Sequence, residues 1–296
     1  MLQQYETFNV ETNGVTINGI KGGSGPPLLL LHGYPQTHVM WHKVIDQLSE
    51  RFTVVATDLR GYGDSSKPEG EADHSNYSKR VMAKDQVEVM RELGFDEFYL
   101  VGHDRGARVG YRLALDHPER VTKFVALDIV PTLLMYEKTD MTFARYYYHW
   151  FFLIQDAPYP EELISQNPEY FLETNLIKLA RYQSINESPF SVKAYQEYLR
   201  CFQLPKAIHA MCEDYRAGAS IDLVHEKEDL VANRKIQCET LVLWGEKGVV
   251  HHCFEPLDEW RKFATHVQGK ALPCGHFIPE EVPELLLEEL LGFLEG

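Results

Sequence analysis

Five short runs of apolar residues punctuate the chain. They are Leu28–Leu31, Phe52–Asp58, Phe98–Asp104, Val121–Asp128 and Leu241–Gly248. Continuous apolar runs of this length are typical of strands that are covered on both faces. We therefore expect these five segments to form the buried centre of a β-sheet.

The segments between these runs have the spacing of amphipathic helices. We expect helices over about 38–49, 79–93 and 105–117. The last segment, PELLLEELLGFLE, places Leu286 and Leu290 on one stripe, which predicts a closing helix. Strands that alternate with helices favour an α/β fold, with a mostly parallel sheet and helices on both faces.

The composition changes between residues 132 and 232. Strand-like runs disappear there, and the sequence becomes helical, aromatic and punctuated by proline, most densely in ARYYYHWFFLIQDAPYPEEL. We predict a core made of residues 1–131 and 233–296, and an inserted helical cap made of residues 132–232. Because ligands of open α/β sheets bind at the carboxyl ends of the strands, we expect the cap to cover the site.

The charge of the chain limits the classes of partner that it can bind. With 296 residues, 44% of them apolar, the chain can bury a sizeable core, but its formal net charge of −15 argues against a nucleic-acid partner. The polar start, MLQQYETFNVETNG, does not resemble a secretory signal, and no apolar run is long enough to span a membrane. We expect a cytoplasmic protein with no membrane partner. An anionic substrate would need local arginines, because the overall field repels it.

The segment VGHDRGARVG contains a frame, Gly102-x-Asp104-x-Gly106, between a strand-like run and a helical one. In hydrolases, a strand–turn–helix frame of this kind holds the nucleophile at a strained turn. Here the central residue is an aspartate. An aspartate that merely caps a helix gives the same local pattern, so the frame alone leaves both interpretations open.

Further features follow the frame in the chain order of an α/β-hydrolase. Asp128 ends a strand-like run, and His276 lies between a short strand-like run and the closing helix. Nucleophile, acid and then histidine is the order that this fold requires, so we expect Asp104, Asp128 and His276 to form a catalytic triad. Glu246, in the turn after the next strand, is the alternative acid.

The loop His32-Gly33-Tyr34-Pro35 follows the first apolar run. In this fold such a loop supplies one backbone N–H to an oxyanion hole, and the residue after the nucleophile supplies the other. Those groups would be the N–H groups of Tyr34 and Arg105.

A carboxylate nucleophile suits attack at a saturated carbon, where it forms an alkyl ester. A water activated by histidine then attacks the carbonyl carbon of the aspartate and regenerates it. The leaving group must depart from carbon, which makes halide and epoxide oxygen the two candidates.

Along essentially the whole chain, the sequence resembles the haloacetate dehalogenases of the α/β-hydrolase superfamily, and the fluoroacetate dehalogenases in particular. The resemblance rests on the motifs HGYPQT, DLRGYGDSSKP, GHDRGAR, ALDIVP, YYHW, CEDYRAG and PCGHF. It implies that fluoroacetate and chloroacetate-like acids are hydrolysed to glycolate and halide through an ester on Asp104. It also implies a homodimer that uses no cofactor and no metal.

The resemblance further implies which residues bind the substrate. Arg105 and Arg108 would hold the carboxylate, while His149, Trp150 and Tyr215 would receive the halide. Guanidinium groups can orient a carboxylate and offset its repulsion from the nucleophile, and N–H and O–H donors suit a departing fluoride. A neutral epoxide or haloalkane has no use for the arginines. Epoxide hydrolysis and haloalkane dehalogenation on the same scaffold are the alternatives, and a non-catalytic binding protein ranks below them.

Some positions depart from the family pattern, and others are assigned no role in the reaction. Ala107 stands where a glycine is usual, and Trp150 is the only tryptophan of the predicted cap, so the size of the substrate slot and the preferred halogen stay open. Tyr182 is a candidate for the wall that a second tryptophan would form. Tyr146 and Tyr147 are expected to pack within the cap, and the acidic run from Glu280-Glu281 to Glu288-Glu289 is expected to be a solvated helix face.

Overall fold

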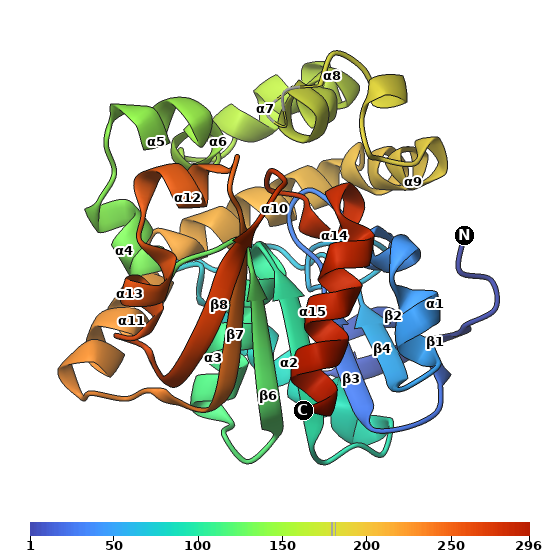
Figure 1. The fold of residues 1–296 in the computed structure, drawn as a ribbon. Helices are drawn as coiled ribbons and strands as arrows, with labels where there is room; N and C mark the ends of the chain where they lie inside the picture. The colour runs from blue at the N-terminus through green and yellow to red at the C-terminus, as the bar shows by residue number, and fades with distance from the viewer. Residues whose placement is uncertain (179, 181) are drawn as a thin grey trace.

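The computed structural model describes residues 1–178, 180 and 182–296, and its centre is one sheet (Figure 1). Within these residues the strand order is β1-β2-β4-β3-β5-β6-β7-β8. Strand β2 is antiparallel to β1 and β4, whereas every neighbouring pair from β4 to β8 is parallel. The predicted α/β class with a mostly parallel sheet is therefore confirmed.

The five apolar runs correspond to the central strands β3 to β7. The strands are β1 Glu6–Thr12, β2 Val15–Gly23, β3 Pro27–Leu31, β4 Thr53–Thr57, β5 Phe98–His103, β6 Val121–Leu127, β7 Ile236–Gly245 and β8 Ala264–Leu272. The apolar runs do not predict β1 and β2. Strand β1 is exposed or half-exposed except at its last residue, and half-exposed side chains interrupt the buried ones in β2, so neither strand forms a continuous apolar run.

The helices of the core cover both faces of the sheet. Figure 1 shows α15 in front of the sheet, with α2 and α3 behind it. These helices and the shorter ones are η1 His38–Lys43, α1 Ile45–Ser49, η2 Ser75–Tyr77, α2 Lys79–Glu92, α3 Arg105–Asp116, α12 Val249–Cys253, α13 Pro256–Trp260, α14 Ile278–Glu281 and α15 Pro283–Glu295. The stripe of the closing helix is confirmed, because Leu286 and Leu290 are fully buried.

The helical stretch expected over 38–49 is present but divided in two. Val44 has φ −120°, which ends the 3-10 helix η1 before the short helix α1 begins.

A run of short helices lies between β6 and β7, and we call α4 to α11 the cap helices. They are α4 Thr132–Glu137, α5 Met141–Tyr146, α6 Tyr148–Phe152, α7 Tyr159–Gln166, α8 Pro168–Glu173, η3 Thr174–Lys178, η4 Ile185–Glu187, α9 Val192–Phe202, α10 Pro205–Gly218 and α11 Ile221–Val231. Figure 1 shows α5 to α9 above the sheet, with α10 passing between them and the strand ends. Within the described residues, none of the helices is long and apolar enough to cross a bilayer. That the cap helices form a domain of their own stays a prediction.

Candidate active site

Asp104 occupies the turn between β5 and α3. Its backbone has φ 47° and ψ −117°, a conformation that L-residues rarely adopt. The two flanking glycines make the turn possible. A Cβ on Gly102 would lie 2.6 Å from the Ala107 nitrogen, and a Cβ on Gly106 would lie 2.4 Å from the Leu31 carbonyl oxygen. The turn therefore holds the Asp104 side chain at the carboxyl end of the sheet.

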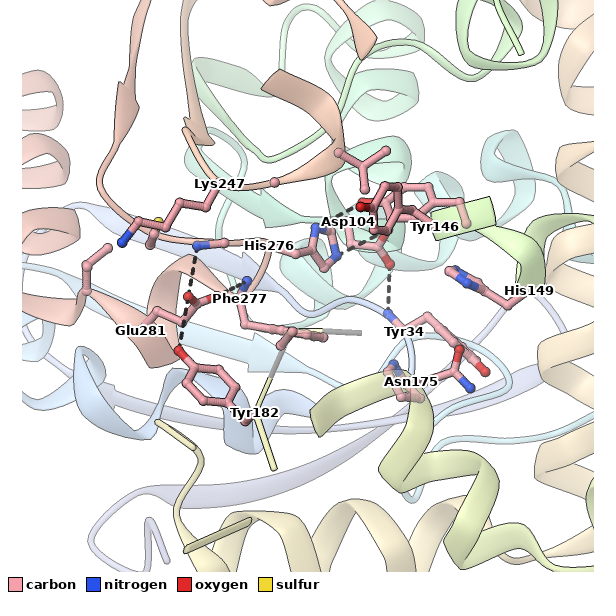
Figure 2. Close-up of a pocket in the computed structure, with 18 of the residues that line it drawn as sticks. Tyr34, Asp104, Tyr146, His149, Asn175, Tyr182, Lys247, His276, Phe277 and Glu281 are labelled. Carbon is pink, nitrogen blue, oxygen red and sulfur yellow. Dashed lines mark hydrogen bonds and ion pairs between the residues drawn. The ribbon is translucent and has the colours of Figure 1, made fainter. Parts of the chain in front are cut away.

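The carboxylate of Asp104 is buried but has polar neighbours. Its Oδ1 accepts a hydrogen bond of 2.9 Å from the Tyr34 backbone N–H, and its Oδ2 lies 3.9 Å from His276 Nε2 (Figure 2). Burial alone would raise the pKa of Asp104. The charges of His276, His103 and the neighbouring arginines outweigh burial and lower that pKa, which keeps the carboxylate ionised.

His276 is held by Asp128, which follows β6. The Nδ1 of His276 lies 2.5 Å from Asp128 Oδ2, and the other oxygen, Oδ1, accepts from the Gly245 N–H at 2.9 Å. Burial opposes protonation of His276, but the hydrogen bond and charge of Asp128 raise the pKa of the imidazole. Of the two acids that the sequence offers, Asp128 contacts the histidine, whereas Glu246 is exposed at the end of β7.

Arg105, the first residue of α3, is fixed by a carboxylate of the cap. Its Nε and Nη2 each lie 2.8 Å from an oxygen of Asp214 on α10, and its guanidinium stacks 4.3 Å from the centre of the Tyr215 ring. Asp214 also accepts from Lys79 and from the Tyr62 hydroxyl. Asp214 does not bind the third guanidinium nitrogen of Arg105, Nη1.

Arg108, one turn further along α3, is buried in a different environment. Its guanidinium donates to Val130 O at 3.0 Å and to Thr132 Oγ1 at 2.9 Å, and it lies 4.8 Å from the Trp150 ring centre. Among the residues that the structure describes, no carboxylate lies within ion-pair distance of Arg108, and its Nε has no hydrogen-bond partner. Burial lowers the pKa of Arg108, as expected for a cation without an ion pair of its own.

Aromatic residues of the cap lie around Asp104 with unused polar atoms. His149 stacks on Tyr34 at 5.7 Å between ring centres, and Tyr215 contacts Tyr34 edge-on at 5.2 Å. Trp150 lies 6.1 Å from Tyr215 by the same measure. Four buried atoms lack a hydrogen-bond partner in the described chain: Tyr34 Oη, His149 Nδ1, Trp150 Nε1 and Tyr215 Oη.

A cavity of about 360 Å³ opens beside Asp104. Figure 2 shows Tyr34 and His149 on one side of Asp104, and Lys247, Glu281 and Tyr182 beyond His276. The predicted wall residue Tyr182 lines this cavity, as do His149 and Tyr215, whereas Arg105, Arg108 and Trp150 are not among its lining residues. Ala107 is fully buried and is not among the lining residues either, so its methyl group does not narrow the cavity directly.

Two expectations about side-chain environment are correct only in part. Tyr147 also lines the cavity, with its hydroxyl 3.4 Å from His276 Nδ1, and does not merely pack within the cap. Within the acidic run, the pair Glu280 and Glu281 is not a solvated face, although Glu284 and Glu288 further along are exposed. Glu280 is 1% exposed and accepts from the Tyr198 hydroxyl, while Glu281 lines the cavity.

Sequence reasoning missed Asp214 and Glu281 as parts of the site. Glu281 follows His276 by only five residues, a spacing that could have indicated a contact with the histidine loop. Asp214 directly precedes Tyr215, which the sequence singles out, but nothing in that motif indicates that Asp214 pairs with Arg105.

The chain matches a known protein family and is similar to several described proteins. The sequence profile of the "alpha/beta hydrolase fold" matches residues 26–283. The chain is similar to a fluoroacetate dehalogenase from Burkholderia sp., with 46% identity over 99% of this chain and 95% of that protein. It is also similar to a soluble epoxide hydrolase from Corynebacterium sp. (strain C12), with 34% identity over 95% of this chain and 94% of that protein. A solved structure from Nostoc sp. PCC 7120, provisionally described as an α/β hydrolase, matches with a TM-score of 0.95 and 56% identity over 99% of both chains.

Proposed function

Since the chain belongs to the α/β-hydrolase family, we propose that it is a haloacetate dehalogenase, which converts fluoroacetate and chloroacetate-like acids to glycolate and halide. The α/β-hydrolase fold and the resemblance to fluoroacetate dehalogenases, both predicted from the sequence motifs, are confirmed. The substrate, the covalent route and the roles of the individual residues are our proposal. The homodimer, the cytoplasmic location and the need for no cofactor or metal stay predictions.

The observation that carries the proposal is a set of unused buried groups around a buried carboxylate. Within the described chain, the Arg108 guanidinium has no ion pair, and polar atoms of His149, Trp150 and Tyr215 have no partner. Burying a charge without a partner costs several kcal/mol, and burying a neutral polar group without a partner costs about 1–3 kcal/mol. A substrate with a carboxylate at one end and a halogen at the other would use both kinds of group.

In the first step, Asp104 attacks the carbon that carries the halogen. Because the Tyr34 N–H holds Oδ1, we assign the attack to Oδ2. A new C–O bond forms as the carbon–halogen bond breaks, and the halide leaves with both bonding electrons toward the His149, Trp150 and Tyr215 donors. Arg108, with the Nη1 of Arg105, orients the substrate carboxylate for this in-line displacement.

In the second step, water hydrolyses the ester. His276 takes a proton from water through Nε2, and the hydroxide attacks the carbonyl carbon of Asp104. Asp128 stabilises the imidazolium ion that forms. The Tyr34 N–H, which already donates to Oδ1, and the Arg105 N–H would stabilise the oxyanion. The tetrahedral intermediate then breaks the bond between the Asp104 carboxyl carbon and Oδ2, and the His276 imidazolium returns its proton to that oxygen. Glycolate leaves with Oδ2, so one oxygen of the regenerated carboxylate comes from water.

Oxygen-18 labelling tests the covalent route. In a single turnover of fluoroacetate in labelled water, we expect the label in the Asp104 carboxylate. We expect His276→Asn to release one equivalent of halide and then stop with the ester on Asp104, which intact-protein mass spectrometry detects. Label found only in glycolate, with none in the protein, would contradict the proposal.

Epoxide hydrolysis is the second candidate. It is favoured by the buried Tyr215 phenol, whose pKa burial raises, because a protonated phenol without a partner in the described residues could donate to an epoxide oxygen. The same carboxylate and histidine would serve both reactions. The unpaired Arg108 favours an anionic substrate over a neutral one. Parallel assays of halide release from haloacetates and of diol formation from a small terminal epoxide distinguish the two candidates.

A further inference from the structure

The loop that carries His276 is bound by a carboxylate that the proposed reaction does not use. Glu281, the last residue of α14, accepts hydrogen bonds from the backbone N–H groups on both sides of the histidine. Gly275 N–H donates to its Oε2 at 2.8 Å, and Phe277 N–H donates to its Oε1 at 2.9 Å (Figure 2). Both carboxylate oxygens therefore hold the backbone of this one loop.

The glycine before the histidine allows this contact. A Cβ on Gly275 would lie 3.0 Å from Glu281 Oε1 and 3.2 Å from Oε2, closer than a side chain normally approaches. On the other side of the loop, the ring of His103 lies with its Nε2 2.8 Å from the His276 carbonyl oxygen, which accepts from it. The main chain around His276 is thus held from two directions, independently of the bond between its ring and Asp128.

The same carboxylate also reaches the cap. The hydroxyl of Tyr182, which lines the cavity, donates to Glu281 Oε2 at 3.5 Å. Glu281 is itself a lining residue, so its charge lies in the same cavity as Asp104 and His276. One side chain therefore joins the histidine loop, the cavity wall and the segment after η3.

We propose that Glu281 is a positioning residue for His276, which sets the place of the imidazole for the hydrolytic step through the two backbone N–H groups beside it. This inference rests on the proposed covalent mechanism. Attack by Asp104 on the substrate does not involve the imidazole as a base, whereas hydrolysis of the ester does. Loss of Glu281 should therefore slow the second step and leave the first unchanged.

The charge of Glu281 has a second effect on the same step. The carboxylate contributes to raising the pKa of His276, after the larger contributions of Asp128 and Asp104. The titratable groups that face His276 are Asp104, Asp128, His103, Tyr147 and Glu281. A neutral residue at 281 should lower the pKa of the imidazole and move the acid limb of the hydrolysis rate to lower pH.

Rapid-quench kinetics with chloroacetate test the inference on Glu281→Gln and Glu281→Met. Glutamine keeps one acceptor oxygen and methionine keeps none, so the losses should be graded. We expect the first-turnover release of chloride to keep its wild-type rate constant. Hydrolysis of the ester should slow by up to about 100-fold for methionine, the loss that about an ångström of misplacement can cause. The ester should then accumulate and be visible by mass spectrometry. Glu284→Gln, which removes an exposed charge three residues away, is the matched control and should behave as wild type.

Two results would overturn the inference: equal slowing of both steps, which indicates a general effect on folding, or wild-type hydrolysis in both Glu281 variants. Because glutamine is nearly isosteric with glutamate, Glu281→Gln keeps the test valid if the methionine variant does not fold. His276→Asn separates the two levels of the argument. If that variant accumulates the ester and Glu281→Met does not, only the positioning role fails. If His276→Asn forms no ester, the covalent mechanism itself fails.

Discussion

Replacing Arg108 by methionine should separate substrate binding from stability. The wild-type guanidinium is buried without an ion pair among the described residues, and its hydrogen bonds go to neutral acceptors such as Val130 O and Thr132 Oγ1. Burial of an unpaired charge costs several kcal/mol, whereas each hydrogen bond that the charged guanidinium makes returns about 1.5–3 kcal/mol. These contributions nearly cancel, so we expect Arg108→Met to change the free energy of unfolding by less than about 2 kcal/mol.

The effect on turnover should be much larger. Truncating one partner of a desolvated, charge-assisted contact costs about 2–5 kcal/mol. At about 1.4 kcal/mol for each factor of ten, this predicts a loss of roughly 30-fold to 5,000-fold in kcat/KM for fluoroacetate. Halide release measured across substrate concentrations gives this ratio directly.

Arg105→Met is the matched comparison, because Arg105 has the carboxylate partner that Arg108 lacks. Removal of Arg105 leaves the buried Asp214 with Lys79 as its remaining cation, and breaking a buried pair costs about 3–5 kcal/mol. Urea unfolding should therefore rank Arg105→Met clearly below Arg108→Met in stability. Wild-type kcat/KM in Arg108→Met, or equal destabilisation of the two variants, would refute this reasoning.

Three further predictions concern the base, the halide site and the pH dependence of stability. Asp128→Asn should reduce turnover by about 10³-fold to 10⁴-fold. Because the base must be neutral and Asp128 raises the pKa of His276, the acid limb of the rate profile should also move to lower pH in this variant. Trp150→Phe keeps a ring near Arg108 but removes the indole N–H, so steady-state assays should show a loss of about 10-fold or more for fluoroacetate and a smaller loss for bromoacetate. Burial raises the pKa of Glu280 from 4.5 to about 7, so the folded protein binds a proton that the unfolded chain releases, and stability falls as the pH rises from about 4.5 to 7. Denaturant titrations should show that Glu280→Gln removes up to about 3 kcal/mol of this fall, and an unchanged slope would contradict the assignment.

The central sheet and the elbow were predictable because each leaves a local pattern. Strands β3 to β7 are buried on both faces and therefore read as apolar runs, whereas β1 and β2 mix exposed and buried side chains and leave no such run. Asp104, Asp128 and His276 were found because each follows or closely precedes a recognisable element. The chain order of those elements carries the information.

The contacts between the cap and the core were not predictable in the same way. Asp214 lies 109 residues from Arg105, and no periodicity in the sequence indicates that they pair. Glu280 and Glu281 look like the start of an acidic helix face, but α14 ends at Glu281 and turns both side chains toward buried partners. Such pairings depend on where short helices end. The amino-acid pattern determines the ends of helices only approximately.

The contacts that close the site have a consequence for how the chain folds. The Tyr34 N–H reaches Asp104 across 70 residues, and His276 reaches Asp128 across 148. Long-range contacts of this kind form late, because the entropy of closing the intervening loops opposes them until the sheet is in place. Only a fragment that spans residues 34 to 276 contains all four groups. Recovery of turnover during refolding would therefore report assembly of the sheet from β3 to β8, and a rapid return of helical signal alone would not.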